Sequence, residues 1–140
     1  MLCLEEQGEQ LREAATGGNQ EEVTRILDSS SSSNILHSSD MYGDTALHLA
    51  AANGWLGVCQ TLLNHGADPT VANLIGDTAL HLAARHNSLG TAQLLLESRA
   101  DLEATNGIGL TALHLAAGNA VGKMLVAHYR RLASTGGGRG

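Results

Sequence analysis

Apolar and polar positions alternate along this chain in short blocks, and the blocks repeat. The apolar run LHLAA begins at Leu47, Leu80 and Leu113. A short polar turn follows the first two runs and leads to longer apolar segments, 56–66 and 89–99, in which Leu, Val and Ala recur at helical spacing. Each unit is therefore predicted to consist of a turn, a short helix, a second turn, a longer helix and a loop.

A nine-residue phrase sets the interval between units. GDTALHLAA begins at Gly43 and at Gly76, and GLTALHLAA begins at Gly109, so successive copies are 33 residues apart. A fixed period of this length indicates stacked units, because one such unit cannot bury its apolar face alone. We therefore predict an all-α solenoid of helix-turn-helix units with about four repeats.

The repeated phrase resembles the signature of the ankyrin-repeat family. The match consists of the Gly-x-Thr-Ala-Leu-His-Leu-Ala-Ala strings, the leucines of the longer helices, and the GAD and RAD strings that begin at Gly66 and Arg99. It covers residues 40–129, with Ala in each unit where the family most often has Pro. The resemblance implies that β-turn or hairpin fingers project from the stack.

The resemblance also assigns structural roles to two residues of each unit. The glycine of each phrase lies in the turn of a finger: Gly43, Gly76 and Gly109. The histidine hydrogen-bonds to the turn backbone and pins each finger to its helix: His48, His81 and His114. These residues are therefore expected to be structural.

A single ankyrin-repeat domain is predicted over residues 1–134, since the stack also needs end units with polar outer faces. Residues 11–27 align with 47–63 as a cap repeat at an offset of 36, which places three extra residues in the serine run 29–33. That run is interpreted as a solvated insertion, with a phosphorylation site as the alternative. The predicted units are a cap repeat 4–39, repeats 40–72 and 73–105, a modified C-terminal repeat 106–133, and a disordered Gly-rich tail 135–140.

Composition narrows the class of protein. The 140 residues include no Phe and 2% aromatics, and the formal net charge is −6. A core of Leu, Ala, Val and Ile suits closely packed small helices, and an acidic chain is poorly suited to a phosphate backbone. Cys3 and Cys59 form no disulfide or metal pattern, and the N-terminus lacks the features of a signal peptide. We expect an intracellular protein of the cytoplasm or nucleus, monomeric, with no nucleic-acid or membrane partner.

The recurring histidines raise the possibility of a metal site, and their spacing argues against it. Equivalent positions on packed helices lie about 8–10 Å apart, whereas ligands of one zinc ion lie about 2.0–2.1 Å from it. No nucleophile is paired with a base, and Asp44 and Asp77 recur with the repeat as turn residues do. The sequence therefore predicts neither an enzyme nor a cofactor.

Protein binding is the function that the sequence favours. Solvated turns seldom carry many large apolar side chains, and a contiguous apolar stripe usually marks a binding site. The residues expected at the finger crests are Met41, Tyr42, Asp44, Leu74, Ile75, Asp77, Ile108 and Leu110. The first helices add Asn53, Arg85 and His86 on the concave face, and Trp55 is either a binding residue or a cover for the convex side.

Three alternatives stay open at this point. Neighbouring fingers could bury these apolar groups against one another instead of exposing them. The chain could be a regulatory or inhibitory subunit of an enzyme or transcription factor that uses the same surface, or a structural fragment that associates with itself. For the binding module, the expected partner is another protein that presents apolar side chains flanked by basic ones. Leu80 and Leu113 are both expected in the core.

Overall fold

The structure is a computed structural model that describes residues 4–29, 33–116 and 118–136. Over these ranges the chain forms eight α-helices, one 3-10 helix and no strand. The elements are α1 (Leu4–Gly17), α2 (Gln20–Ser29), η1 (Ser33–His37), α3 (Ala46–Asn53), α4 (Leu56–Asn64), α5 (Ala79–Arg85), α6 (Leu89–Glu97), α7 (Ala112–Leu115) and α8 (Ala120–Gly136).

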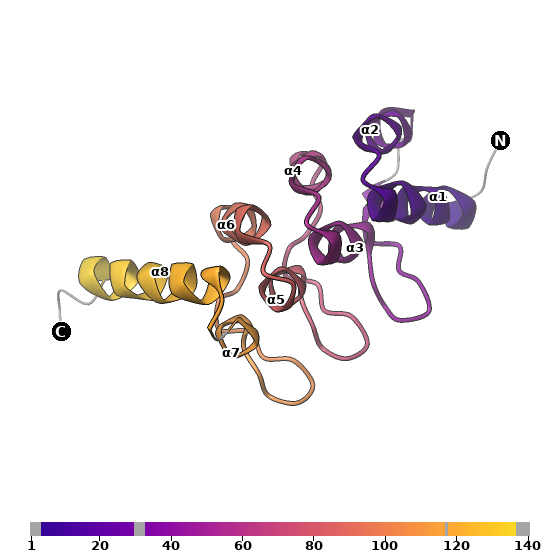
Figure 1. The fold of residues 1–140 in the computed structure, drawn as a ribbon. Helices are drawn as coiled ribbons and strands as arrows, with labels where there is room; N and C mark the ends of the chain where they lie inside the picture. The colour runs from indigo at the N-terminus through magenta and orange to yellow at the C-terminus, as the bar shows by residue number, and fades with distance from the viewer. Residues whose placement is uncertain (1–3, 30–32, 117, 137–140) are drawn as a thin grey trace.

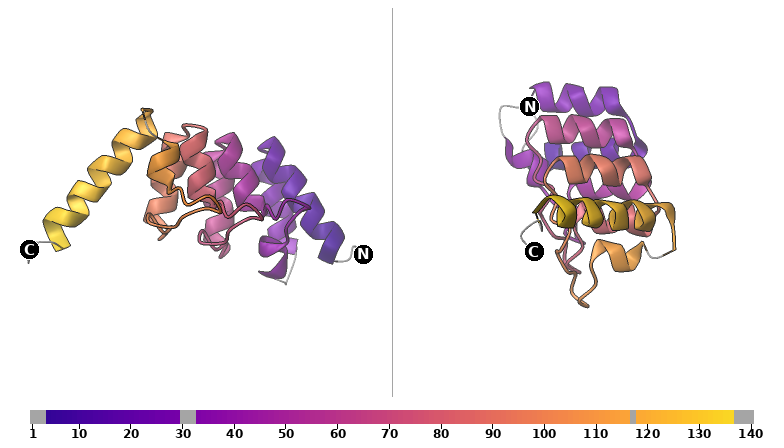
Figure 2. Two further views of the ribbon diagram at one scale, coloured as in Figure 1. Left: turned by 90° about the horizontal axis from the view of Figure 1, so that it is seen from below. Right: turned by 90° about the vertical axis from the view of Figure 1, so that its left-hand side faces the viewer.

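The helices form two rows that run side by side (Figure 1). The inner row consists of α1, α3, α5 and α7, and the outer row of α2, α4, α6 and α8. Each inner helix packs on the next inner helix and on its own outer helix, and each outer helix packs on the next outer one. The loops that precede α3, α5 and α7 project from the inner row, away from the outer row, and Figure 2 shows the stack from two further sides. The predicted all-α solenoid is confirmed.

Each short inner helix of the repeated phrase begins at a threonine. Thr45 has extended backbone angles, and its side chain accepts a hydrogen bond from the backbone N–H of His48. The ring of His48 in turn accepts one from the N–H of Thr45, and the same reciprocal cap occurs at Thr78 and Thr111. Such a capping box satisfies two of the otherwise unpaired donors at a helix start. The capping box therefore stabilises the start of each helix, although the position after the cap is Ala and not the Pro that is common in the family.

The core runs between the two rows and is built from small aliphatic side chains. Leu47 and Leu80 are buried, and the alanine pairs that follow them, at 50–51 and 83–84, are fully buried as well. Because alanine occupies little volume, consecutive inner helices approach closely and bury a continuous apolar surface. The outer helices contribute their own buried side chains, Val58, Cys59, Leu62, Thr91, Ala92 and Leu95.

The N-terminal end of the stack is a repeat that has kept its buried face. Leu11, Ala15 and Val23 are fully buried, whereas Glu9 and Glu13 are exposed. The serine run lies in large part outside the described residues. After it the chain returns to the stack as η1 and buries Ile35 and Leu36, which the sequence analysis did not anticipate.

The C-terminal end departs most from the repeat. Helix α7 has four residues, and α8 has 17, the longest helix of the described residues. Val121 and Leu125 anchor α8 in the core, and each later residue adds one backbone hydrogen bond to a helix that has already formed. Helix α8 therefore includes residues 135 and 136, which were expected in a disordered tail; residues 137–140 lie outside the described residues.

No helix among the described residues combines the length and the apolar character that crossing a bilayer requires.

Candidate protein-binding surface

Each finger is a tight turn in which the side chain of one Asp or Asn residue accepts hydrogen bonds from the backbone of the same turn. In the second finger, the N–H of Asn73 donates to the carbonyl of Asp77 at 2.9 Å, and the N–H of Gly76 donates to the carbonyl of Asn73 at 3.0 Å. The Asn73 Oδ1 atom also accepts from the N–H groups of Ile75 and Asp77, at 3.1 and 2.9 Å. The corresponding residues Asp40 and Asn106 make the same bonds in the other two fingers. An Asx side chain of this kind fixes a turn without help from neighbouring units.

Neighbouring fingers are joined through their backbones near the crests. The N–H of Leu74 donates to the carbonyl of Tyr42 at 3.0 Å, and the N–H of Gly107 donates to the carbonyl of Ile75 at 2.8 Å. Both donors belong to the following finger and both acceptors to the preceding one. The three fingers therefore form one connected edge.

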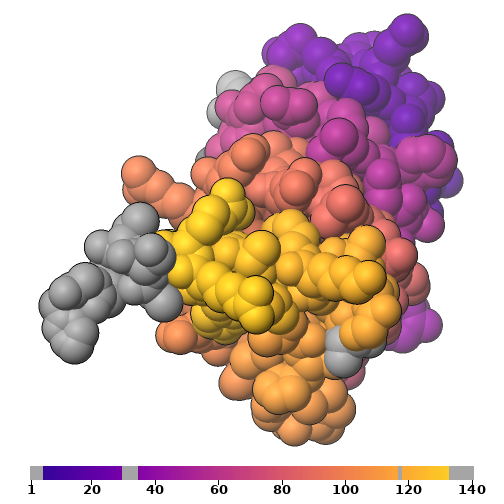
Figure 3. All heavy atoms as spheres, turned by 60° about the vertical axis from the view of Figure 1, so that its left-hand side comes forward, coloured from indigo at the N-terminus to yellow at the C-terminus, as the bar shows by residue number. Residues whose placement is uncertain are grey.

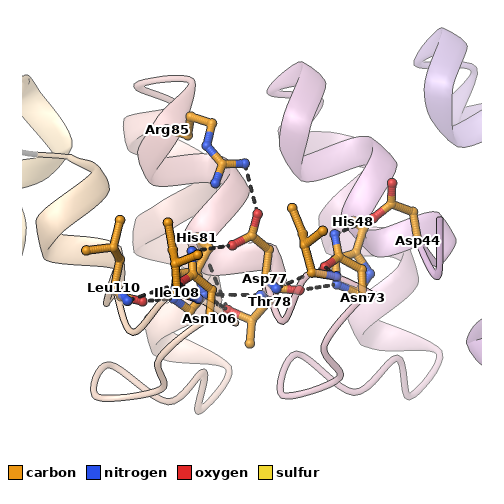
Figure 4. Close-up of polar contacts among 11 residues, drawn as sticks. Asp44, His48, Asn73, Asp77, Thr78, His81, Arg85, Asn106, Ile108 and Leu110 are labelled. Carbon is orange, nitrogen blue, oxygen red and sulfur yellow. Dashed lines mark hydrogen bonds and ion pairs between the residues drawn. The ribbon is translucent and has the colours of Figure 1, made fainter.

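Side-chain amides join the same fingers a second time (Figure 4). The Nδ2 group of Asn73 donates to Oδ1 of Asp44 at 2.8 Å, and that of Asn106 donates to Oδ1 of Asp77 at 3.0 Å. These asparagines were not among the residues predicted from the sequence, although their separation of 33 residues matches the period of the repeat. The pattern stops at the last finger, where Leu110 stands at the position of the acceptor aspartates.

Two of the repeated histidines, His48 and His81, each hydrogen-bond to two fingers. The N–H of Thr45 donates to Nδ1 of His48 at 3.1 Å, so this nitrogen carries no proton and Nε2 carries one. Nε2 donates to the carbonyl of Asp77 in the next finger at 3.0 Å, and Nε2 of His81 donates to that of Leu110 at 2.9 Å. The expectation that each histidine pins its own finger was therefore incomplete, because the ring also holds the finger that follows.

Burial favours the neutral form of His48, and the hydrogen bonds of its ring leave no nitrogen available to bind a metal ion. Burial lowers the pKa of His48 below 6.5, and the hydrogen bond to the Asp77 carbonyl opposes that shift. Both ring nitrogens of His48 and of His81 are engaged with protein atoms. His114 keeps its cap with Thr111 but is exposed. Over the described ranges, no three His, Cys, Asp or Glu side chains gather as metal ligands would.

The crests of the fingers present large apolar side chains to solvent. The exposed fractions are 79% for Met41, 64% for Tyr42, 76% for Leu74, 61% for Ile75 and 80% for Ile108. These values decide against the alternative in which neighbouring fingers cover one another's side chains. Because the fingers are hydrogen-bonded side by side, the five side chains follow one edge of the molecule. We call this set of five the crest.

Asp77 does not reach the surface, which corrects the expectation that it contacts a partner. Its side chain is fully buried, with Oδ1 bonded to Asn106 and Oδ2 2.9 Å from Nη1 of Arg85 (Figure 4). A buried carboxylate is costly unless it is paired, and here both oxygens are. Asp44 and Leu110 are half-buried, and Asp44 already binds Asn73.

The other expected binding residues lie at the far ends of the inner helices. Asn53 and His86 are exposed at the turns that lead to the outer helices. The fingers lie at the other ends of these helices: α3 spans about 12 Å between the first finger and Asn53, and α5 spans about 10 Å between the second finger and His86, so neither residue is continuous with the crest.

Trp55 lies at the same end as Asn53 and serves the contact between the first two repeats. Its Nε1 donates to the carbonyl of Thr16 at 2.9 Å. Its ring lies against Gly18, where an added Cβ atom would come within 2.6 Å of ring carbons. The side chain is 42% exposed. Trp55 therefore joins α1 to the α3–α4 turn.

A hollow beside the first finger extends the crest onto the inner helices. Its lining combines Met41 and Tyr42 of the finger and Leu49 of α3 with three charged residues of α1: Glu9, Arg12 and Glu13. Both glutamates are exposed. Glu9 and Glu13 were not predicted as binding residues, because nothing in the local sequence of α1 shows that the first finger lies beside this helix.

The comparison with known families agrees with this geometry. A family model described as ankyrin repeats (3 copies) matches residues 11–106 and 72–135. A search of curated proteins found no match. Ankyrin repeats are generally protein–protein interaction modules and are typically not catalytic. The chain belongs to the ankyrin-repeat family.

Proposed function

We propose that this chain binds a partner protein through the crest and the adjoining hollow of the first finger. The observation that carries the proposal is the exposure of five large apolar side chains on fingers whose turns are closed by backbone and Asx hydrogen bonds. A fixed backbone keeps the five side chains in place before binding, so little conformational entropy is lost when a partner covers them. Exposed apolar stripes on monomeric proteins are typical of interaction sites.

The chemistry of the hollow indicates what the partner presents. Tyr42 and Leu49 offer apolar surface, while Glu9, Glu13 and the half-buried Asp40 place carboxylates around it. An apolar side chain of the partner would fit on Tyr42 and Leu49, and a neighbouring Lys or Arg would lie near the carboxylates. The proposed partner segment therefore combines apolar and basic side chains.

The test compares crest variants with a matched leucine outside the crest. A partner is captured from source cells on the wild-type chain and purified, and its dissociation constant is measured with Leu74→Ala, Ile75→Ala and Tyr42→Ala. Leu56→Ala is the control, because Leu56 is also exposed, at 44%, but lies on α4. At least one crest variant should lose about 2 kcal/mol or more, the threshold of a hot spot, and the control should bind as the wild type.

The outcome that refutes the proposal is equally definite. If the three crest variants bind the partner as tightly as Leu56→Ala does, the binding site is elsewhere. An activity assay on the captured partner, with and without the chain, decides whether the module inhibits an enzyme or transcription factor. Sedimentation over a concentration series decides whether the crest binds a second copy instead.

A further inference from the structure

The charges of this chain are divided between its two ends. Residues 1–103 carry all 14 acidic side chains and four of the eight Lys and Arg, which gives −10. Residues 104–140 carry the other four cations and no acid, which gives +4. The last repeat is therefore a cationic unit on an otherwise acidic stack. A surface on this repeat attracts acidic ligands, whereas the acidic hollow of the first finger attracts basic ones.

A groove on the last repeat concentrates this positive charge around an apolar floor. Leu113 of α7 lines it together with Gly118, and α8 contributes Gly122 and Val126. Lys123 and Arg130 stand on its rim, both exposed and without an ion pair to any acid in the described ranges. Positions 122, 126 and 130 are four residues apart, so they form one face of α8 along the groove. Figure 3 shows α8 lying across this end of the stack.

The earlier repeats show what kind of element covers this surface. Leu47 and Leu80 occupy the position of Leu113, and both are buried because α5 packs on α3 and α7 packs on α5. His48 and His81 are buried in the same way, whereas His114 is exposed. The groove is therefore the counterpart of a surface that a helix covers at each earlier step.

A further repeat of the same kind does not fit this position well. At each earlier step an asparagine of the following finger donates to an aspartate, Asp44 or Asp77. Leu110 stands at that place in the last finger and offers no side-chain acceptor. The helix that covers the groove is thus better supplied by a different protein.

We propose that the groove between α7 and α8 binds an amphipathic helix of a partner protein that carries acidic residues beside its apolar stripe. The apolar stripe lies on Leu113 and Val126, and the acidic side chains pair with Lys123 and Arg130. In this mode of binding, the apolar side chains at positions i, i+3, i+4 and i+7 of the partner helix pack into the groove. This surface is separate from the crest, so the inference goes beyond the proposed function.

Other polyanions match the groove less well. Two cations around an apolar floor provide few of the phosphate contacts on which binding to nucleic acid depends, and a duplex has no apolar stripe to cover Leu113 and Val126. The acidic helices of a second copy are also poor ligands. Leu11 and Ala15 of α1 and Val23 of α2 are fully buried in their own stack, so these helices have little apolar stripe left to offer.

The probe is a fluorescein-labelled helical peptide of about 14 residues, with Leu at i, i+3, i+4 and i+7 and Glu on both flanks of the stripe. A second peptide has Lys in place of each Glu. Fluorescence anisotropy measures the binding of both to the full chain. Because the acidic hollow of the first finger is expected to take basic apolar segments, both peptides are measured on the chain that carries Glu9→Gln/Glu13→Gln. On that chain the Glu peptide should bind at least about tenfold more tightly than the Lys peptide, because unlike charges meet at the groove in one case and like charges in the other.

Charge reversal on the rim tests the location. The double variant Lys123→Glu/Arg130→Glu should lose about tenfold or more in affinity for the Glu peptide and should prefer the Lys peptide. The matched control is Arg25→Glu/Arg99→Glu, which makes the same change in net charge on two exposed residues that do not line the groove, and it should bind as the wild type. Val126→Asp tests the apolar floor and should weaken both peptides. Circular dichroism checks that every variant is folded.

Several results would overturn the proposal. These are the absence of saturable binding by the Glu peptide, equal binding of the two peptides, or an equal loss in the rim variant and its control. Tighter binding to phosphatidylserine vesicles or to duplex DNA would assign the groove to another ligand. Salt-sensitive self-association that the rim variant abolishes would assign it to a second copy. The crest variant Ile75→Ala should bind the Glu peptide as the wild type does, so failure here leaves the proposed function of the crest untouched.

Discussion

Two glycines in equivalent turns allow the contact between fingers to be measured directly. Gly76 and Gly109 are 33 residues apart, and both have a φ of 85°, in the left-handed region that side chains with a Cβ atom rarely adopt. Replacing either by Ala adds the same conformational strain, about 1–2 kcal/mol. Any difference between Gly76→Ala and Gly109→Ala therefore comes from what surrounds the new methyl group.

The surroundings of the two methyl groups differ sharply. At Gly76 an added Cβ atom would lie 2.5 Å from the backbone nitrogen of Gly107 and 2.9 Å from the carbonyl carbon of Asn106. At Gly109 nothing lies within 4 Å. Backbone atoms cannot turn aside as a flexible side chain can, so the third finger must shift away from the second.

That shift breaks the bond from the N–H of Gly107 to the carbonyl of Ile75, whose length is 2.8 Å. A typical hydrogen bond contributes about 0.5–1.5 kcal/mol. The shift also strains the buried bond from Asn106 to Asp77, which has a charged acceptor. Gly76→Ala should therefore lower the free energy of unfolding by about 2–4 kcal/mol, and Gly109→Ala by about 1–2 kcal/mol.

Chemical denaturation followed by far-ultraviolet circular dichroism measures both values. Gly66→Ala is a second open control, since Gly66 also has a positive φ, of 99°, and nothing lies within 4 Å of its added Cβ atom. Equal losses at Gly76 and Gly109, or a larger loss at Gly109, would refute the reasoning that the fingers form one connected edge.

Two further predictions concern the repeated phrase. The free energy of unfolding should fall as the pH drops below 6.5, because burial lowers the pKa of His48, so that the unfolded chain binds a proton more readily than the folded chain does. His65 acts in the opposite direction, since its hydrogen bond to Thr61 raises its pKa. The test is urea denaturation at a series of pH values, in which His48→Gln should lose less stability on acidification than the wild type does. Leu80→Ala should cost about 2–5 kcal/mol as a buried leucine, whereas Leu113→Ala, at the half-buried equivalent position, should cost less in the same assay.

The repeat itself could be predicted from the sequence because its signals are local. The threonine cap, the apolar run and the turn glycine each lie within one nine-residue phrase, and a copy at a fixed interval implies a stack. Contacts between units are not local in this sense. His48 and the carbonyl of Asp77 are 29 residues apart, as are Asn106 and Asp77, so the phrase alone does not reveal them.

Identical phrases also acquire different surroundings. Asp44 and Asp77 both stand in GDT, yet Asp77 is buried and Asp44 is not fully so. The difference lies in Arg85, which pairs with Asp77, because the equivalent residue of the preceding unit is Ala52. Leu113 and His114 repeat the letters of Leu80 and His81 but lack a described helix on one side. Exposure is thus a property of the neighbours, and a single phrase does not encode them.

The division between constant and variable positions within this one chain gives the binding proposal its physical basis. Threonine, histidine and the turn glycine recur in all three phrases, and the caps, cross-finger bonds and tight turns use them. The crest residues change from Met41-Tyr42 to Leu74-Ile75 to Ile108, and the backbone hydrogen bonds between fingers use N–H and carbonyl groups and not these side chains. The fold therefore places few demands on the crest beyond its backbone, while exposing apolar groups there carries a cost in solubility. A partner that covers the crest accounts for these side chains, which folding of the stack alone does not.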